Sequence, residues 1–492
     1  MKRKIIYTFL MLFIFSLAGY NNVFGKNKID LEKINVASNK QWKIKFNRKL
    51  DVSTINKGVT VVDSKGNNID VQTEVQDNTL IVKCPKQGYK SGETYFIKMN
   101  NNLKSVKKSF LDKDYILKFT IEKQEKFKLG DDRLLTEYNY LIDGKRVGLV
   151  TNQTGVNSQG KSMIDELANY KKAEFNALYG PEHGINGQAS AGDYVKSYID
   201  EKLKIPVYSL YNDTRMPTED MLQGIDVLVF DIQDIGARSY TYMSTLNYCM
   251  TAAAKYNKQI IVLDRPNPLG GEIMDGPILE DKYKTFVGVD NLPMTHGMTA
   301  GELAKFFNRK INAELVVVPM NGYKRNMIFQ DTGLDWVQSS PYIPNITSVF
   351  CYNATGLGEG TGIFQRDYFK WVGGKGIDSD NFASLLNNAN LPGVTFIPEG
   401  TPSAGGVRLK VTDYHTFNPA KTGIYVLAYA HSLNRFEVPK SGERIIMFDK
   451  IMGTDMIGKY LEEGYTPQHI EEKYRVELEK FKEERKKYLI YN

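Results

Sequence analysis

The sequence predicts an α/β protein: a Rossmann-like, mostly parallel sheet with a smaller C-terminal α/β domain, preceded by a β-sandwich module. Between residues 147 and 318, short apolar runs alternate with helical stretches, which is typical of a parallel sheet covered on both faces. Ahead of them, short alternating runs are separated by turn residues, as in β-sandwiches. We therefore expect a signal peptide at 1–25, a sandwich at 26–123, a Rossmann-like catalytic domain at 124–320 and a C-terminal domain at 321–492.

The first 25 residues have the pattern of an export signal. Basic residues at 2–4 precede an apolar run at 5–17, which is shorter than the roughly 20 residues of a membrane span. Residues 23–25 suit a cleavage site, and Tyr20 stands where a lipoprotein would carry its lipidated cysteine. The sequence thus predicts a secreted or cell-wall-associated protein, with an uncleaved anchor as the alternative.

The sandwich module shows four strand patterns. Apolar and polar residues alternate over 42–46, 80–82, 95–99 and 115–120, with turn residues between them. The pattern resembles bacterial immunoglobulin-like modules of surface proteins. Residues 26–126 hold 21 Lys and Arg against 12 Asp and Glu, a net charge of +9, which leaves −5 on the rest of the chain after the +3 of the signal. A basic module suggests anionic wall polymer as a partner, with a merely solvated lysine-rich surface as the alternative, and export argues against nucleic acid.

Six apolar runs predict the strands of the catalytic sheet, and helical stretches between them predict helices at 162–170 and 242–256. The runs are 147–151, 175–179, 207–210, 227–232, 260–263 and 315–318. No G-x-G-x-x-G follows the first run and no P-loop is present, so no nucleotide cofactor is expected. In the C-terminal domain we expect strands at 405–411 and 423–430 and a charged helix at 470–488.

Polar residues bounded by Gly or Pro follow four of the predicted strands. In an open parallel sheet, ligands bind beyond the carboxyl ends of the strands, where loops position functional groups on a rigid scaffold. Any one cluster can be only a turn with local hydrogen bonds, but their common edge indicates a functional site. The clusters contain Asn152 and Gln153, Glu182 and His183, then Asp231, Gln233, Asp234 and Arg238, and finally Asp264, Arg265 and Asn267.

The carboxylates in these clusters favour glycoside cleavage. That reaction needs a carboxylic acid to protonate the leaving oxygen and an anionic partner for the oxocarbenium-like state. Tyr240 and Tyr242 can stack on sugar rings, with core packing as the alternative. Of the five histidines, His183 and His296 lie in loop settings and are expected at the site. The three cysteines are far apart, and no zinc or nucleophile-elbow pattern is present, so no metal is expected.

Six stretches of the chain together resemble the signature blocks of the exo-β-N-acetylmuramidase family, glycoside hydrolase family 171. They are 151–155, 180–184, 206–211, 230–238, 263–271 and 296–299, and the resemblance runs from about residue 129 to the C-terminus. It implies release of terminal N-acetylmuramic acid from the non-reducing ends of peptidoglycan fragments, in a cleft between a Rossmann-like and a smaller α/β domain. It implies no metal or organic cofactor.

The same resemblance suggests roles for residues. Glu182 is expected to be the catalytic acid, with His183 and Asp231 orienting it or binding the sugar. We infer that Arg238 and Arg265 bind the lactyl carboxylate of muramic acid, because a guanidinium pairs with a carboxylate through two parallel hydrogen bonds. Substrate contacts are expected from Asn152, Gln153, Gln233, Asp234, Arg238, Tyr240, Tyr242, Asp264, Arg265, Asn267, His296 and Glu359.

The later half of the chain departs from the family pattern. Residues 363–367 replace a small, polar continuation of the Gly-rich segment, and Ala404 stands where a Cys is common. The alternatives are therefore a hydrolase of another amino sugar and a non-catalytic wall-binding or adhesion protein. The partner of Glu182 also stays open, and with it a retaining or inverting course. The candidates are Asp231, Asp234, Glu359 and the substrate's own N-acetyl group.

Overall fold

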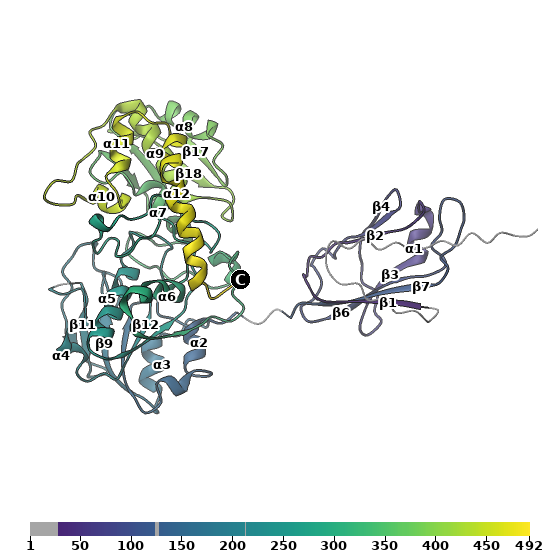
Figure 1. Cartoon of the computed structure of the whole chain (residues 1–492), viewed down its shortest axis with the longest axis horizontal. Helices are drawn as coiled ribbons and strands as arrows, with labels where there is room; N and C mark the ends of the chain where they lie inside the picture. Colours follow the sequence, from purple (N-terminus) through teal and green to yellow (C-terminus); the bar gives the residue numbers. More distant parts are fainter. Residues whose placement is uncertain (1–27, 124–126, 212) are drawn as a thin grey trace, which may run out of the picture. The chain divides into compact units, whose positions relative to one another are not determined.

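The computed structural model describes residues 28–123, 127–211 and 213–492 and divides the chain into two compact units, Met1–Lys126 and Phe127–Asn492 (Figure 1). The predicted signal peptide at 1–25 lies outside the described residues. Within the described ranges, no helix combines the length and the apolar character that a membrane crossing requires. The division after Lys126 comes close to the predicted start of the catalytic domain.

The first unit is a sandwich of two β-sheets, with strand orders β1-β7-β6-β3 and β2-β5-β4. Every second residue of β7 is buried, as expected for a sheet that packs one face on a core. The Phe119 ring of β7 lies 4.9 Å from the Trp42 ring of the other sheet, so both sheets share one core. The four predicted strand patterns are confirmed. The strands are β1 (Lys28–Val36), β2 (Trp42–Lys45), β3 (Val59–Asp63), β4 (Thr73–Gln76), β5 (Thr79–Val82), β6 (Thr94–Met99) and β7 (Asp114–Ile121), and one short helix is α1 (Ile55–Gly58).

The second unit is built on a seven-stranded sheet of order β10-β11-β9-β8-β12-β13-β14. All pairs except that of β10 with β11 are parallel. Numbered along the chain, the parallel strands lie in the order 3-2-1-4-5-6, which is the Rossmann order with its reversal between β8 and β12. The six predicted strands are confirmed. The strands are β8 (Arg146–Thr151), β9 (Glu174–Gly180), β10 (Tyr198–Ile199), β11 (Pro206–Ser209), β12 (Val227–Asp231), β13 (Gln259–Leu263) and β14 (Glu314–Val318).

Helices cover both faces of this sheet, as the continuous apolar runs predict. Along β12, Val227 and Val229 face one core and Leu228 and Phe230 face the other. The first core is closed by α2 (Gly130–Leu134) and α3 (Met163–Asn169), the second by α5 (Tyr242–Lys255) and α6 (Ala300–Ile311), and Figure 1 shows the two pairs on opposite sides. A four-residue helix, α4 (Glu219–Leu222), precedes β12.

Residues 321–492, the C-terminal part, contain an antiparallel sheet of order β15-β16-β18-β17. Helix α12 runs from this part back to the Rossmann-like part at 127–320 (Figure 1), where Phe481 packs 5.7 Å from Phe306. The domain boundary predicted at 320 lies inside this unit and stays a prediction. The elements are α7 (Ile346–Thr355), β15 (Ile363–Arg366), β16 (Trp371–Gly374), α8 (Ser379–Asn388), β17 (Val394–Pro398), β18 (Gly405–Val411), α9 (Pro419–Asn434), α10 (Met447–Met452), α11 (Met456–Glu462) and α12 (Pro467–Arg485).

One strand prediction in the C-terminal part is wrong. Residues 423–430 lie inside the 16-residue helix α9, although the strand at 405–411 and the helix at the C-terminus are confirmed. A continuous apolar run has no period that separates a buried strand from a buried helix. The start signals decide instead: the Asn418 side chain accepts the N–H of Lys421, and Pro419 occupies the first turn, where its missing N–H costs nothing.

The separate core of the first unit gives a stability prediction. Trp42→Ala should destabilise this unit by about 3–5 kcal/mol, because it leaves a cavity in a packed core. In differential scanning calorimetry of the full chain, we expect the transition of the first unit to shift and that of the second to stay in place. Phe110→Ala, at a ring that is 53% exposed, is the matched control and should shift neither. A common shift of both transitions in Trp42→Ala would contradict independent cores.

Candidate active site

The loop after β9 presents Glu182 and His183 in a tight turn. The carbonyl of Pro181 accepts the N–H of Gly184 at 2.9 Å, and His183 has a φ of 71°. This left-handed conformation is unfavourable for a side chain larger than glycine and persists where the surroundings hold it, often at functional sites. Here the Nδ1 of His183 donates to the carbonyl of Ala189 at 2.7 Å. That bond places the ring proton on Nδ1 and leaves Nε2 as an acceptor in the neutral ring.

Two hydrogen bonds fix the carboxyl group of Glu182, which is 8% exposed. Oε2 accepts from the Thr241 hydroxyl at 2.5 Å, and Oε1 accepts the N–H of Gly192 at 3.2 Å. Thr241 is the residue that precedes α5, so the carboxyl lies at the positive end of a 14-residue helix. Glu182 is therefore held in one orientation by its own loop, through Gly192, and by the start of α5, through Thr241.

Glu182 opens into a cavity of about 430 Å³ between the Rossmann-like and C-terminal parts, which we call the Glu182 cavity. This volume falls in the range of about 300–1,000 Å³ that small-molecule sites occupy. The Rossmann-like part contributes Glu182, His183, Gly192, Tyr211, Arg215, Ser239, Tyr240, Thr241 and Phe286, and the C-terminal part Tyr342, Tyr352, Glu359, Phe369, Met447 and Ile451. Neither part alone encloses the cavity.

Aromatic rings form one wall of the Glu182 cavity. The Tyr352 ring lies 5.8 Å from that of Tyr240 and 4.9 Å from that of Phe369. Burial, together with the nearby carboxylates of Glu182, Asp234 and Glu359, raises the pKa of Tyr352 to about 12. Tyr352 is thus a protonated phenol among carboxylates at neutral pH, able to donate a hydrogen bond beside an apolar surface suited to a sugar ring.

Two further aromatic rings of the cavity contact the guanidinium of Arg215. The Arg215 guanidinium lies 4.5 Å from the centre of the Tyr211 ring and 4.4 Å from that of Phe286. Burial and the Glu182 carboxylate raise the pKa of Tyr211 to about 12, and the Arg215 guanidinium opposes the rise. The Tyr211 hydroxyl therefore lies close to both charged groups.

Four of the predicted site residues line the Glu182 cavity: Glu182, His183, Tyr240 and Glu359. Sequence reasoning missed Tyr211, Arg215, Thr241, Phe286, Tyr352 and Phe369. Tyr211 and Arg215 follow β11, so the strand-end rule applied to a fifth strand would have found them. The C-terminal residues follow no strand of the parallel sheet and carry no such signal.

Asp231 and Arg265 do not line the cavity, in contrast to the catalytic and binding roles expected for them. The Arg265 Nε donates to Asp231 Oδ1 at 2.6 Å and its Nη2 to Asp131 Oδ2 at 2.6 Å, and all three side chains are buried. Burial raises the pKa of both carboxyls, and the guanidinium opposes the rise. Arg265 borders a smaller cavity of about 250 Å³ with Thr154 and Gln233.

Arg238 is also engaged elsewhere. Its guanidinium donates to the carbonyls of Pro277 at 2.8 Å, Leu292 at 2.7 Å and Ile451 at 2.7 Å. Complete burial lowers the pKa of Arg238 to about 9. Because Ile451 lies in α10, Arg238 fastens the C-terminal part to the Rossmann-like part and is not free to bind a carboxylate.

Other predicted residues fasten loops to one another. Asp264 accepts from Thr299 at 2.9 Å, from the N–H of Gly301 at 2.7 Å and from the Tyr491 hydroxyl at 2.6 Å, and burial raises its pKa to about 7. Asn267 donates to the carbonyl of Met298 at 3.1 Å. These contacts are buried and do not reach the Glu182 cavity.

His296 and Asp234 form a buried pair. The Nδ1 of His296 accepts the N–H of Met298, so its Nε2 carries the proton and faces Asp234 Oδ2 at 3.3 Å. The Gln233 amide donates to the carbonyls of Asp234 and Pro266, at 2.9 and 2.8 Å. The pair lies outside the residues that line the cavity, although Asp234 contributes to the high pKa of Tyr352.

The remaining three predicted site residues, Asn152, Gln153 and Tyr242, form hydrogen bonds with residues that do not line the cavity. Asn152 accepts from the N–H and hydroxyl of Thr154, at 2.9 and 2.6 Å. Gln153 donates to the carbonyl of Ser339 at 3.0 Å, and the buried Tyr242 hydroxyl donates to the same carbonyl. Among the described residues, no group of three or more His, Cys, Asp or Glu side chains is placed to hold a metal ion.

Three family models match the chain. "Exo-beta-N-acetylmuramidase NamZ, N-terminal" covers residues 147–347, "Exo-beta-N-acetylmuramidase NamZ, C-terminal" covers 350–491, and "Bacterial Ig-like domain" covers 28–121. The "Peptidoglycan beta-N-acetylmuramidase NamZ" of Bacillus subtilis (strain 168) is 45% identical over 386 residues, which are 75% of this chain and 92% of the relative. Two crystal structures of DUF1343 family proteins from Bacteroides fragilis NCTC 9343 are 35% and 27% identical, with TM-scores of 0.68 and 0.56, each covering 75% of this chain and 99% of its own.

The buried Arg265 network predicts a pH-dependent loss of stability. Arg265→Met should lower the free energy of unfolding at pH 7 by about 3–5 kcal/mol, because two buried carboxylates lose their counter-ion. Without the guanidinium, the folded-state pKa values of Asp131 and Asp231 rise further above the unfolded value of about 3.9. Stability conferred by such groups is present at low pH and is lost as pH rises through the folded pKa.

Denaturant unfolding between pH 4 and pH 7 measures this effect. We expect the gap between wild type and Arg265→Met to widen steadily as the pH rises. A variant that keeps the stability of the wild type at pH 7 but binds substrate more weakly would contradict the structural role of Arg265.

Proposed function

Because the chain belongs to the exo-β-N-acetylmuramidase family, we propose that it is an exo-acting glycoside hydrolase that releases terminal N-acetylmuramic acid from peptidoglycan-derived sugars in cell-wall turnover. One observation carries the assignment of its chemistry: the fixed carboxyl of Glu182 opens into a cavity of about 430 Å³ with an aromatic wall. A cavity of this size can hold a terminal sugar of a peptidoglycan fragment.

Glu182 acts as the acid of the reaction. Its carboxylic acid gives a proton to the glycosidic oxygen as the bond from that oxygen to the anomeric carbon breaks, and the leaving sugar departs as a neutral alcohol. Water then adds to the anomeric carbon and returns a proton to the Glu182 carboxylate. The hydrogen bonds from Thr241 and Gly192 keep the carboxyl in place through both steps.

Two groups remain as the partner that stabilises the oxocarbenium-like state, one a carboxylate and the other a neutral amide oxygen. Glu359 lines the cavity, and the acetamido oxygen of the substrate can reach its own anomeric carbon. Asp231 is excluded by its buried pairing with Arg265, and Asp234 is outside the residues that line the cavity. A trifluoroacetamido substrate separates the two groups, since its weaker oxygen nucleophile slows only a substrate-assisted reaction.

Glu182→Gln should reduce kcat/KM by about 10²–10⁴-fold on a disaccharide substrate, because a poor leaving group needs the proton. The reduction should be much smaller on a dinitrophenyl β-N-acetylmuramide, whose leaving group is already a weak base. Release of N-acetylmuramic acid, measured by chromatography, gives both rates. Glu201→Gln, at an exposed position that does not line the cavity, is the matched control. Full activity of Glu182→Gln on the disaccharide would rule out its role as acid.

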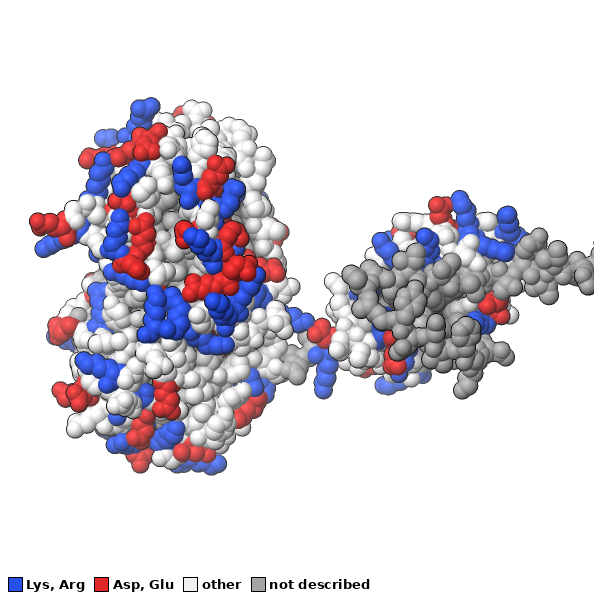
Figure 2. Space-filling model, viewed as in Figure 1, with Lys and Arg blue, Asp and Glu red and all other residues white. Residues whose placement is uncertain are grey.

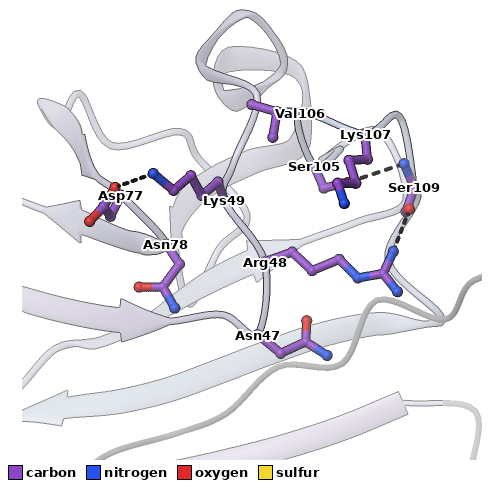
Figure 3. Close-up of a pocket in the computed structure, with 9 residues that line it drawn as sticks. All are labelled: Asn47, Arg48, Lys49, Asp77, Asn78, Ser105, Val106, Lys107 and Ser109. Carbon is purple, nitrogen blue, oxygen red and sulfur yellow. Dashed lines mark hydrogen bonds and ion pairs between the residues drawn. The ribbon is translucent and has the colours of Figure 1, made fainter.

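We propose that the first unit binds anionic wall polymer. A groove of about 910 Å³ in this unit is bordered by Arg48, Lys49 and Lys107, together with the amides of Asn47 and Asn78 (Figure 3). In Figure 2, Lys and Arg side chains are visible on the uncovered part of this unit, with several Asp and Glu side chains among them. A phosphate or carboxylate polymer fits such a surface.

The ion pair of Lys49 in the groove is weak enough to be exchanged. Lys49 pairs with Asp77 at 2.9 Å, but the two side chains are 68% and 76% exposed, and exposed pairs contribute about 0–1 kcal/mol. Arg48 donates to the Ser109 hydroxyl at 2.7 Å, an arrangement that orients its guanidinium at the groove (Figure 3). These features support the proposal that the groove takes an anion.

Replacing Arg48, Lys49 and Lys107 together by Gln should weaken retention of the full chain on purified cell wall and flatten its dependence on salt. Co-sedimentation with the wall, before and after removal of its phosphate polymers, measures the effect. The control is a second triple variant in which Gln replaces Lys65, Lys86 and Lys90. It removes the same amount of charge from the same unit, but outside the groove. Equal losses in the two triple variants would contradict a specific groove.

We also propose that the chain is exported and acts outside the cell or at the wall. The basic and apolar pattern of the first 25 residues supports this proposal. Mass spectrometry of the protein recovered from the culture medium and wall fraction should find a new N-terminus close to residue 26. Recovery of the intact chain from the cytosol alone would contradict export.

A further inference from the structure

The Glu182 cavity contains a cation that the hydrolytic step does not use. Arg215 is the only Lys or Arg among the described residues that line it. No carboxylate in the described part of the chain forms an ion pair with Arg215, although Glu182 and Glu359 line the same cavity. Its charge is therefore available to a ligand.

Two aromatic rings hold the guanidinium of Arg215 in place. The ring centres of Tyr211 and Phe286 lie 5.9 Å apart, and the guanidinium carbon is 4.5 and 4.4 Å from them. Each such contact contributes about 0.5–1 kcal/mol at an exposed site. The two ring centres therefore lie on one side of the guanidinium and do not sandwich it. The N–H groups that point away from the rings can donate to a carboxylate, which a guanidinium binds through two parallel hydrogen bonds.

The position of Arg215 relative to the acid matches the chemistry of muramic acid. Glu182, Arg215 and Tyr211, whose ring contacts the Arg215 guanidinium, line the same cavity. In N-acetylmuramic acid, the lactyl ether with its carboxylate is on C3, which C2 separates from the anomeric carbon whose substituent Glu182 protonates. A cation in the same cavity as the acid can thus meet the lactyl carboxylate while the glycosidic oxygen meets Glu182.

We propose that Arg215 binds the lactyl carboxylate of N-acetylmuramic acid and thereby selects this sugar over N-acetylglucosamine. The inference rests on the proposed function and replaces the expectation that Arg238 and Arg265 bind this carboxylate. It also explains how a cavity lined by Glu359 accepts an anionic sugar: without Arg215, the Glu359 carboxylate and the lactyl carboxylate would repel each other.

Paired substrates test the contact directly. One is a chromogenic β-N-acetylmuramide, and the other is the same glycoside with its lactyl group as the neutral methylamide. Arg215→Met should lower kcat/KM on the acid by about 10- to 100-fold, the value of a lost charge-assisted hydrogen bond, and leave the methylamide nearly unchanged. Arg215→Lys should lie between, since it keeps the charge and loses the paired donors.

Arg366→Met is the matched control. Its guanidinium also packs on two rings, at 5.0 Å from Phe364 and 5.5 Å from Trp371, but it does not line the cavity. The Arg366→Met variant should hydrolyse both substrates at the rates of the wild type. Equal losses on acid and methylamide in Arg215→Met, or no loss on either, would overturn the inference.

Calorimetric binding of free N-acetylmuramic acid separates this inference from the proposed function. Arg215→Met should weaken the binding of N-acetylmuramic acid by about 10- to 100-fold, as for kcat/KM, and leave the binding of N-acetylglucosamine unchanged. A wild type that binds the muramic acid through Arg215 but hydrolyses no muramide would refute the proposed function alone. Equal binding by wild type and Arg215→Met would refute the inference alone.

Discussion

The buried guanidinium of Arg265 holds together the edge of the sheet on which the whole site is built. Asp231 is the last residue of β12, Arg265 follows β13, and Asp131 lies in α2, so one cation joins three segments. An isolated charge in such a place would cost several kcal/mol, and the pairing is what makes its burial tolerable. The loops at the topological reversal of the sheet are fixed by this network and by the Asp264, Asn267 and Asp234 contacts around it.

The polar side chains of the central loops form hydrogen bonds and ion pairs with one another, and the proposed site of reaction lies beside these loops. Glu182 comes from β9, on the flank of the reversal, and Thr241 at the start of α5 fixes its carboxyl. The C-terminal part supplies the opposite wall, and Arg238 fastens it through the carbonyl of Ile451. The rigid edge therefore positions Glu182, the proposed acid, and the covering part closes the other side of the cavity in front of it.

Much of this architecture could be predicted from the sequence, because it follows from local patterns. The apolar runs give the six parallel strands, and the alternating residues give the sandwich. The prediction of a strand at 423–430 was wrong because a helix that is apolar on all sides has no period that distinguishes it from a buried strand. The polar strand ends correctly indicated the carboxyl edge of the sheet. Which of them face the cavity depends on partners such as Asp131 and Pro277, whose positions no local pattern reveals.

A crystal structure of the Glu182→Gln variant with a disaccharide that ends in N-acetylmuramic acid tests the central claim most directly. We expect the terminal ring in the Glu182 cavity, its glycosidic oxygen within about 2.6–3.2 Å of the residue 182 side chain, and its lactyl carboxylate on Arg215. A sugar bound instead in the smaller cavity beside Thr154, Gln233 and Arg265 would contradict the account.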